Sequence, residues 1–155
     1  MPPDGKSRPM PSTRLSLSSA LGLVLALGLA LAACGTKKSP TEFPDPPDPT
    51  ATFTRVQNEI FTPSCAFSGC HAGAAPQRGM DLSTGRSYGM TVGVQAVEST
   101  RSRIAPGDPA GSYLVSKAAG DATISGGRMP LGGPYLDGTK QKLLVDWVRR
   151  GAPND

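Results

Sequence analysis

Apolar residues form one long, mostly apolar run near the start of the chain and two helical patterns further along it. The run covers residues 15–31 and consists mostly of Leu, Ala, Gly and Val. The first helical pattern places four apolar residues at i, i+3, i+7 and i+8, on one face of a helix: Phe53, Val56, Ile60 and Phe61. The second lies near the C-terminal end: Leu143, Leu144, Trp147 and Val148. These patterns predict a leader segment followed by a domain with a helix at each end.

Capping signals bound the two helices. Thr52 is a suitable N-cap for the first helix, and Pro63 is expected to end it. The last helix is expected to begin near Asp137 or Thr139 and to end at Gly151, because aspartate and threonine favour helix starts and glycine favours helix ends. Both helices therefore have a start and a stop in the sequence.

Shorter elements are predicted between these helices. Residues 83–90 suit a short helical turn. Asp108 followed by Pro109 is typical of a helix start, which predicts a helix over residues 109–119 that Gly120 closes. The chain is therefore predicted to be all-α, a small helical domain with long loops rich in glycine and proline.

Composition indicates that such a fold would benefit from a staple. The 155 residues include 19 Gly and 16 Pro, and only 5% are aromatic. Average usage is about 7% Gly and 5% Pro, so a large self-sufficient core is not expected. A disulfide, a metal or a buried prosthetic group would add stability. The formal net charge is +4 and no Lys/Arg run exceeds two residues, which gives no basis for nucleic-acid binding.

The first 33 residues have the features of a secretory signal peptide. Residues 1–14 are polar and basic, residues 15–31 are apolar, and Leu-Ala-Ala precedes Cys34. This sequence resembles the bacterial lipobox, which implies cleavage before Cys34 and a diacylglycerol on its sulfur. An uncleaved membrane helix is the alternative, but serines shorten the apolar run below the roughly 20 residues that a span needs. The resemblance implies a cell-envelope protein, lipid-anchored to a membrane on the periplasmic or outer-surface side.

Residues 34–51 are predicted to form a tether. Five prolines lie in this stretch: Pro40, Pro44, Pro46, Pro47 and Pro49. Proline removes backbone donors and favours extended conformations, so the stretch is expected to be a semi-rigid spacer. The predicted organisation is a signal peptide over 1–33, the tether over 34–51 and one domain over 52–155.

The candidate chemistry is concentrated in residues 65–71, Cys-Ala-Phe-Ser-Gly-Cys-His, which hold the only histidine and two of the three cysteines. Two thiols and an adjoining imidazole are typical of covalent haem c attachment, in which the sulfurs form thioethers and the histidine becomes an axial iron ligand. The usual motif has two residues between the cysteines, whereas this one has four. Outside the cytoplasm the same pair, Cys65 and Cys70, also fits a disulfide. With His71 they supply three of the four ligands of a zinc site.

The order of motifs along residues 52–153 resembles that of small class I c-type cytochromes. It is more closely similar to the cytochrome-c-like domains abundant in planctomycetes and myxobacteria. The motifs are a helix ending at Cys…Cys-His, a Pro-Gly turn, a Met-Pro in a loop, and a C-terminal helix with a tryptophan. The matching positions are Ile60, Cys65, Cys70, His71, residues 80–82, Ile104, residues 106–109, residues 112–114, residues 129–133, Leu143, Trp147, Val148 and residues 151–153.

This resemblance implies one covalent haem c. Cys65 and Cys70 would be the thioether sites, His71 the proximal iron ligand and Met129 the distal ligand. Because His71 is the only histidine, ligation by two histidines within one chain is excluded. The second side-chain ligand should therefore be a methionine or a lysine.

Three methionines follow the histidine: Met80, Met90 and Met129. Met80 is only nine residues past His71 and is expected on the same side of the ring. Met129 lies in a glycine-rich loop over residues 121–134, which can cross to the opposite face. Filling of the core is the alternative role for any of these methionines.

Ligation by histidine and methionine would leave the iron no open site for substrate, so the predicted function is one-electron transfer and not catalysis. The expected partners are a redox protein and, through Cys34, a membrane. The alternative is a non-haem lipoprotein of cytochrome-like fold, stapled by a disulfide, with a binding or structural role. A haem peroxidase would need an open distal site, and the sequence offers no second histidine for one.

Apolar residues of the later motifs are candidates for the wall of the haem pocket: Ile104, Tyr113, Leu114, Leu136 and Trp147. For Trp147, a place in the core between the last helix and the first is the simpler interpretation. Arg103 has two alternatives, contact with a haem propionate or exposure to solvent.

Overall fold

The first helical segment is an unbroken run of helix from residue 53 to residue 64 in the computed structural model, which describes residues 45–155. It consists of α1 (Phe53–Val56), a π-helical turn η1 (Gln57–Phe61) and α2 (Thr62–Ser64). The predicted cap is confirmed, because the Thr52 hydroxyl accepts a hydrogen bond from the Arg55 amide across 3.2 Å. A proline disturbs mainly the turn that precedes it, and the helix here ends one residue beyond Pro63.

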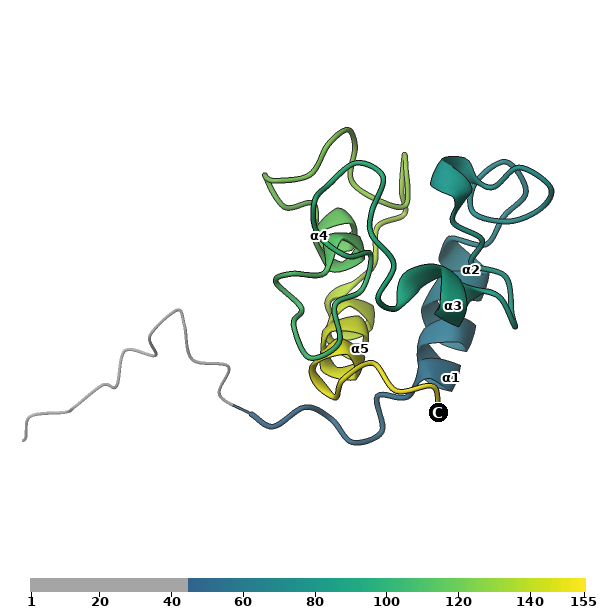
Figure 1. Ribbon diagram of the computed structural model, residues 1–155. Helices are drawn as coiled ribbons and strands as arrows, with labels where there is room; N and C mark the ends of the chain where they lie inside the picture. Colours follow the sequence, from purple (N-terminus) through teal and green to yellow (C-terminus); the bar gives the residue numbers. More distant parts are fainter. Residues whose placement is uncertain (1–44) are drawn as a thin grey trace, which may run out of the picture. The chain divides into compact units, whose positions relative to one another are not determined.

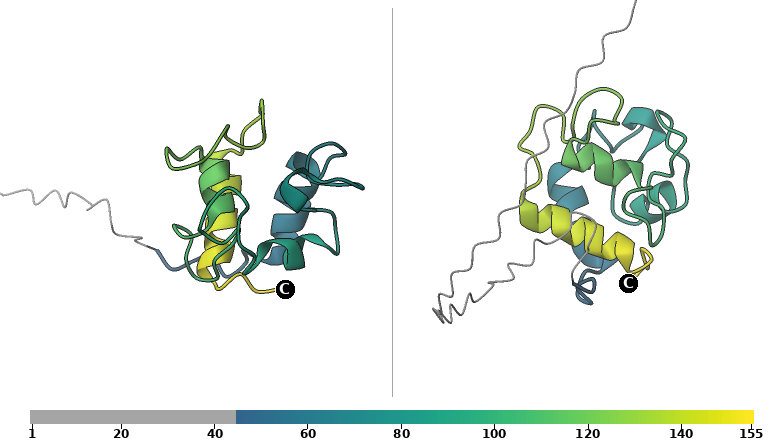
Figure 2. Two further views of the ribbon diagram at one scale, coloured as in Figure 1. Left: turned by 45° about the horizontal axis from the view of Figure 1, so that its top comes forward. Right: turned by 90° about the vertical axis from the view of Figure 1, so that its left-hand side faces the viewer.

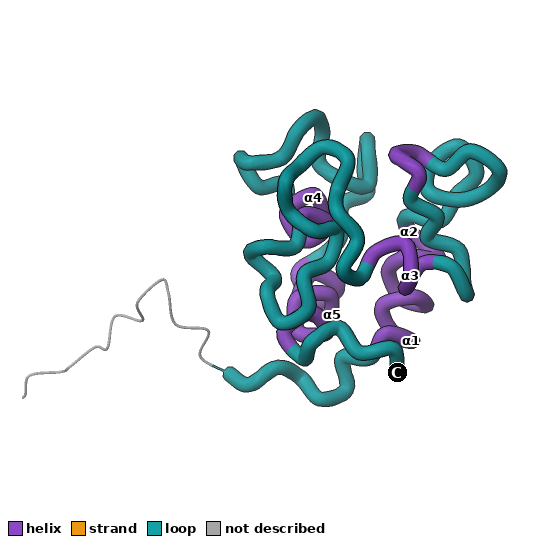
Figure 3. The backbone as a smooth tube through the Cα atoms, in the orientation of Figure 1, coloured by secondary structure: helices purple, strands orange, loops and turns teal. Residues whose placement is uncertain are grey.

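Four further short elements follow, and loops make up most of the remaining chain (Figure 3). They are the 3₁₀ turn η2 (Gln77–Gly79), α3 (Ser87–Thr91), α4 (Tyr113–Ala119) and α5 (Gly138–Arg149). Residues 45–155 contain isolated β-bridges but no sheet. The described part of the chain is therefore helical, as predicted.

The ends of α4 and α5 confirm two sequence signals. The Asp137 carboxylate caps α5 by accepting from the Lys140 amide across 2.9 Å. Gly120 ends α4 with a φ of 78°, in the left-handed region that glycine adopts without strain.

The predicted helix over residues 109–119 is wrong in its first turn, because α4 begins only at Tyr113. The Asp108 carboxylate does accept a backbone hydrogen bond, from Gly111 across 2.9 Å, but it closes an isolated turn. The next two free amides bond to remote carbonyls instead, Tyr113 to Ser102 across 2.8 Å and Leu114 to Arg103 across 2.9 Å. Tertiary contacts therefore place the start of the helix four residues later.

The core joins the first and last helices. Trp147 is fully buried, and its ring centroid lies 5.6 Å from that of Phe53. Its indole N–H donates to the Pro153 carbonyl across 2.9 Å, which satisfies its one polar atom. The core interpretation of Trp147 is thus confirmed, and Ile104, also fully buried, belongs to the same core.

Two groups of helices lie on either side of this core. Figures 1 and 2 show α1 to α3 on one side and α4 and α5 on the other. The Phe53–Trp147 contact closes the molecule at the end where the C-terminus lies. The loops that follow α2 and α4 lie at the other end, and the candidate site is formed there.

The end of the predicted tether contacts the domain. Arg149 donates to the Asp45 carbonyl across 2.9 Å, and Arg150 donates to the Ala51 carbonyl across 2.6 Å. Asp155 accepts from the Phe53 amide across 2.9 Å, so both ends of the described chain meet at α5 and α1. The signal peptide over residues 1–33, the lipidation site Cys34 and most of the tether lie outside the described residues. None of the helices in residues 45–155 has the length and hydropathy that a membrane crossing requires.

Candidate functional site

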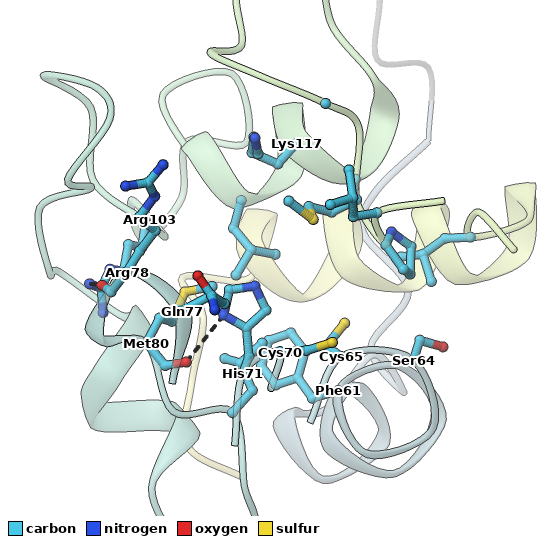
Figure 4. A pocket seen from close by; sticks show the side chains of 18 of the residues that line it. Phe61, Ser64, Cys65, Cys70, His71, Gln77, Arg78, Met80, Arg103 and Lys117 are labelled. Carbon is cyan, nitrogen blue, oxygen red and sulfur yellow. Dashed lines mark hydrogen bonds between the residues drawn. The ribbon is translucent and has the colours of Figure 1, made fainter. Parts of the chain in front are cut away.

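A cavity of about 790 Å³ lies between the two groups of helices. One wall comes from residues 60–82 and the other from residues 96–136 (Figure 4). Single small-molecule or cofactor sites typically measure about 300–1,000 Å³. The cavity is therefore of the size that one bound organic group requires.

All four predicted ligand residues line this cavity: Cys65, Cys70, His71 and Met129. Cys65, Cys70 and His71 come from the wall that follows α2. Met129 comes from the other wall, where its amide donates to the Lys117 carbonyl in the last turn of α4 across 2.9 Å. The structure thus brings together, around one space, residues that are up to 64 positions apart in the sequence.

Residues 65–71, hereafter the 65–71 loop, fold into a closed turn at the end of α2. The His71 amide donates to the Cys65 carbonyl across 3.2 Å, and the Cys70 amide donates to the Phe67 carbonyl across 3.0 Å. Gly69 has a φ of 81°, which permits the reversal. The four-residue spacer therefore returns the second cysteine and the histidine to the helix end from which the first cysteine leaves.

Both cysteines of the loop are free thiols in this structure. Cys65 is half-buried and Cys70 is exposed. Burial, with a smaller effect of the neighbouring Cys70, raises the pKa of the Cys65 thiol to about 11. Cys65 is therefore a neutral thiol at pH 7.

The imidazole of His71 is oriented by a backbone carbonyl. Its Nδ1 lies 3.3 Å from the Met80 carbonyl oxygen (Figure 4). A carbonyl can only accept, so the bond requires the proton on Nδ1 and leaves the Nε2 lone pair available. Burial lowers the pKa of His71 more than backbone bonds to Met80 and Gln77 raise it, which favours the neutral ring. A neutral imidazole with one nitrogen bonded to a carbonyl is the usual form of a metal-ligating histidine.

The three methionines differ in their relation to the cavity. Met80 belongs to the wall of His71, since its carbonyl accepts from that ring. Met90 does not line the cavity, and its carbonyl accepts from Arg103 across 2.7 Å. Met129 lines the cavity from the wall opposite His71, as expected for a second ligand on the other side of a bound group.

Three of the five residues predicted for the pocket wall line the cavity: Tyr113, Leu114 and Leu136. Ile104 and Trp147 do not, because both are fully buried in the core. Three large apolar side chains at the cavity are exposed: Phe67, Val97 and Leu131.

Arg103 is not solvated, which corrects one of its two alternatives. It is only 8% exposed, and it donates to the carbonyls of Arg78 and Met90 across 2.9 and 2.7 Å. Gln57 is a further buried polar residue beside the site, with its amide on the Leu82 carbonyl across 3.1 Å. Gln57 lies four residues after Phe53, on the apolar face of the first helix. A polar residue on that face is the sequence feature by which Gln57 could have been identified.

The described residues do not supply a ligand set for zinc. Nowhere in residues 45–155 do three or more His, Cys, Asp or Glu side chains form a group that could hold a metal ion. No family model, curated protein or solved structure matches this chain. The functional argument therefore depends on the cavity and on the donors that line it.

Proposed function

We propose that this chain is a monohaem c-type cytochrome that transfers single electrons. The observation that supports this proposal best is the one cavity lined by both thiols, the only histidine and Met129. In this proposal Cys65 and Cys70 hold the haem edge as thioethers, and His71 and Met129 are the axial ligands. The helical domain then has a cytochrome-c-like fold.

The residues present fit such a group in three respects. The cavity has the volume of a single cofactor site and largely apolar walls, among them Phe61, Leu82 and Leu114. In the neutral ring the lone pair of His71 lies on Nε2, because Nδ1 donates to the Met80 carbonyl. The second ligand candidate comes from the opposite wall. A donor set of two thiols, an imidazole and a thioether is the one that covalent haem attachment uses.

Haem iron with a histidine and a methionine ligand supplies reversible one-electron chemistry at a raised potential. The chain's own residues bind and orient the group and exclude water from it. Filling both axial positions leaves no site for a substrate, so we propose an electron carrier and not an enzyme. Its partner is then a redox protein.

We propose further that the protein is anchored in the cell envelope through a lipid on Cys34. The support is the sequence alone, namely the lipobox-like Leu-Ala-Ala-Cys after an apolar run. A Cys34→Ser variant, expressed with its leader, should leave the membrane fraction and appear in the soluble fraction. Retention of this variant on membranes at the wild-type level would contradict the lipid anchor.

The decisive experiment is production of the full chain in a bacterium that has a cytochrome c maturation system. We expect a reduced α-band in the pyridine haemochrome spectrum and haem that stays on the polypeptide in a denaturing gel. Cys65→Ser and Cys70→Ser should each weaken this retention, whereas the Cys34→Ser variant should keep it. A chain without haem that is two hydrogen atoms lighter than the reduced form would instead establish the alternative with a Cys65–Cys70 disulfide.

A further inference from the structure

The five residues 78–82, hereafter the 78–82 segment, hold the candidate ligand His71 at two points. The Met80 carbonyl accepts from the ring Nδ1 across 3.3 Å. The Leu82 amide donates to the His71 carbonyl across 2.7 Å. The orientation of the imidazole therefore depends on where this segment lies.

Arg103 fixes the start of the segment. Its guanidinium donates to the Arg78 carbonyl across 2.9 Å, to the Gly79 carbonyl across 3.5 Å and to the Met90 carbonyl across 2.7 Å. These carbonyls come from residues 13 to 25 positions away in the sequence. A planar guanidinium can bond several carbonyls at once, which a lysine ammonium does less well.

The charge of Arg103 has no carboxylate partner among the ion pairs of residues 45–155, although its residue is only 8% exposed. Burial without a counter-ion is costly even when carbonyls solvate the charge. Three backbone carbonyls offset part of this cost by accepting hydrogen bonds from the guanidinium. The cation thus lies in the cavity lining, at the position where it holds the backbone beside Met80.

Gln57 fixes the other end of the segment. Its amide donates to the Leu82 carbonyl across 3.1 Å and to the Thr62 hydroxyl across 3.0 Å. The Ser87 hydroxyl donates to the Gln57 carbonyl oxygen. Gln57 lies in the π-helical turn η1, and such turns are frequent at functional sites.

We propose that Arg103 is a positioning residue for His71. By holding the carbonyls of residues 78 and 79, it keeps the Met80 carbonyl against Nδ1 and selects the Nδ1–H tautomer. The lone pair that can bind a metal then lies on Nε2. That this arrangement prepares His71 to bind iron rests on the proposed function. The tautomer itself does not, because it can be measured without haem.

The proposal is tested by measuring which ring nitrogen of His71, the only histidine in the chain, carries the proton. The full chain, labelled with ¹⁵N-histidine and purified without haem, gives one pair of ring nitrogen signals, and the protonated nitrogen resonates far upfield of the other. At about pH 8.5, two units above the ordinary imidazole pKa, the ring is neutral. We expect the Nδ1–H form to predominate in the wild-type chain. In Arg103→Met the Nε2–H form, which an unconstrained imidazole favours, should become the major species.

Arg101→Met is the matched control. Arg101 is half-buried, more exposed than Arg103, and it too bonds a carbonyl, that of Ala110 across 3.1 Å, but it donates no hydrogen bond to the 78–82 segment. This variant should keep the Nδ1–H form. If Arg103→Met does not fold by circular dichroism, Arg103→Lys, which retains the charge without the planar fork, takes its place.

Wild-type ring signals in a folded Arg103 variant would overturn the proposal, and so would an Nε2–H ring in the wild-type chain. Neither result depends on whether haem is attached. Failure of the haemochrome experiment would reject the cytochrome while leaving the Arg103–His71 relationship to be decided by these spectra.

Discussion

The His71 amide donates a hydrogen bond to the Cys65 carbonyl across 3.2 Å and closes the 65–71 loop. The two extra residues between the cysteines are thereby absorbed in a turn that returns the histidine to the end of α2. The unusual spacing is therefore compatible with both thiols facing the same cavity. The stability of this turn can be tested separately from the attachment of haem.

Gly69→Ala should destabilise the domain by about 1–2 kcal/mol, because the new side chain must adopt a left-handed conformation. Gly69 has a φ of 81°, and a Cβ at this position would contact no atom within 4 Å, so the cost is conformational and not steric. Urea denaturation of the purified chain measures it. Gly138→Ala is the control, since Gly138 lies in α5 with open space around it and should gain up to about 1 kcal/mol. Equal stabilities of the wild-type and Gly69→Ala chains would contradict the turn.

In the haem-loaded protein, Met129→Ala should lower the midpoint potential or open the iron to added ligands. Loss of the thioether should shift the potential by a sizeable part of the roughly 0.8 V that axial ligands span. Redox titration and the spectrum with added cyanide or imidazole measure the effect. Met90→Ala is the control, because Met90 does not line the cavity. An unchanged ligand-field spectrum in Met129→Ala would instead point to Met80.

The haem-free chain should lose stability as the pH falls below about 6.5, the ordinary pKa of histidine. Burial lowers the pKa of His71 in the folded chain, so the unfolded chain binds a proton first and becomes favoured. The loss should level off once the pH is below the folded pKa. Denaturation at pH 7.5 and 5.5 measures it, and His71→Gln should remove this part of the pH dependence. An identical pH dependence in the two chains would show that the ring is not buried.

Trp147→Phe should cost about 1–3 kcal/mol, since it leaves the Pro153 carbonyl without its donor. Haem attachment at low temperature should persist, because Trp147 lies in the core and not in the cavity wall. Thermal unfolding and the pyridine haemochrome of the same preparation separate the two effects. Tyr135→Phe is the control, because Tyr135 is 51% exposed and removal of its hydroxyl should change the free energy of unfolding little. A Trp147→Phe chain of wild-type stability that takes up no haem would place the indole in the site.

The features predicted best from sequence depend on neighbouring residues. The caps Thr52 and Asp137 bond amides three positions ahead, and Gly120 ends a helix by its own conformational freedom. Asp108 shows the limit of such signals. Its carboxylate bonds an amide three positions ahead as a cap would, but the helix does not follow because the amides of Tyr113 and Leu114 bond remote carbonyls.

Features that depend on remote partners could not be predicted. Ile104 and Trp147 are apolar like Leu114 and Leu136, and only the packing of helices decides that the first two are confined to the core while the second two also line the cavity. Arg103 gave two alternatives because the carbonyls that hold it lie far back in the chain. The gathering of the thiols, His71 and Met129 around one cavity agrees with the order of motifs, and the haem itself remains a prediction.

The attachment of residues 45–51 to α5 has a mechanical consequence. A pull that reaches the domain through Asp45 is first borne by the hydrogen bonds from Arg149 and Arg150, and then by α5 and the Trp147 core. These bonds therefore carry part of the load before it reaches the helical run over residues 53–64, which leads to the 65–71 loop. A force on the N-terminal stretch is thus shared between α5 and the helical run that precedes Cys65.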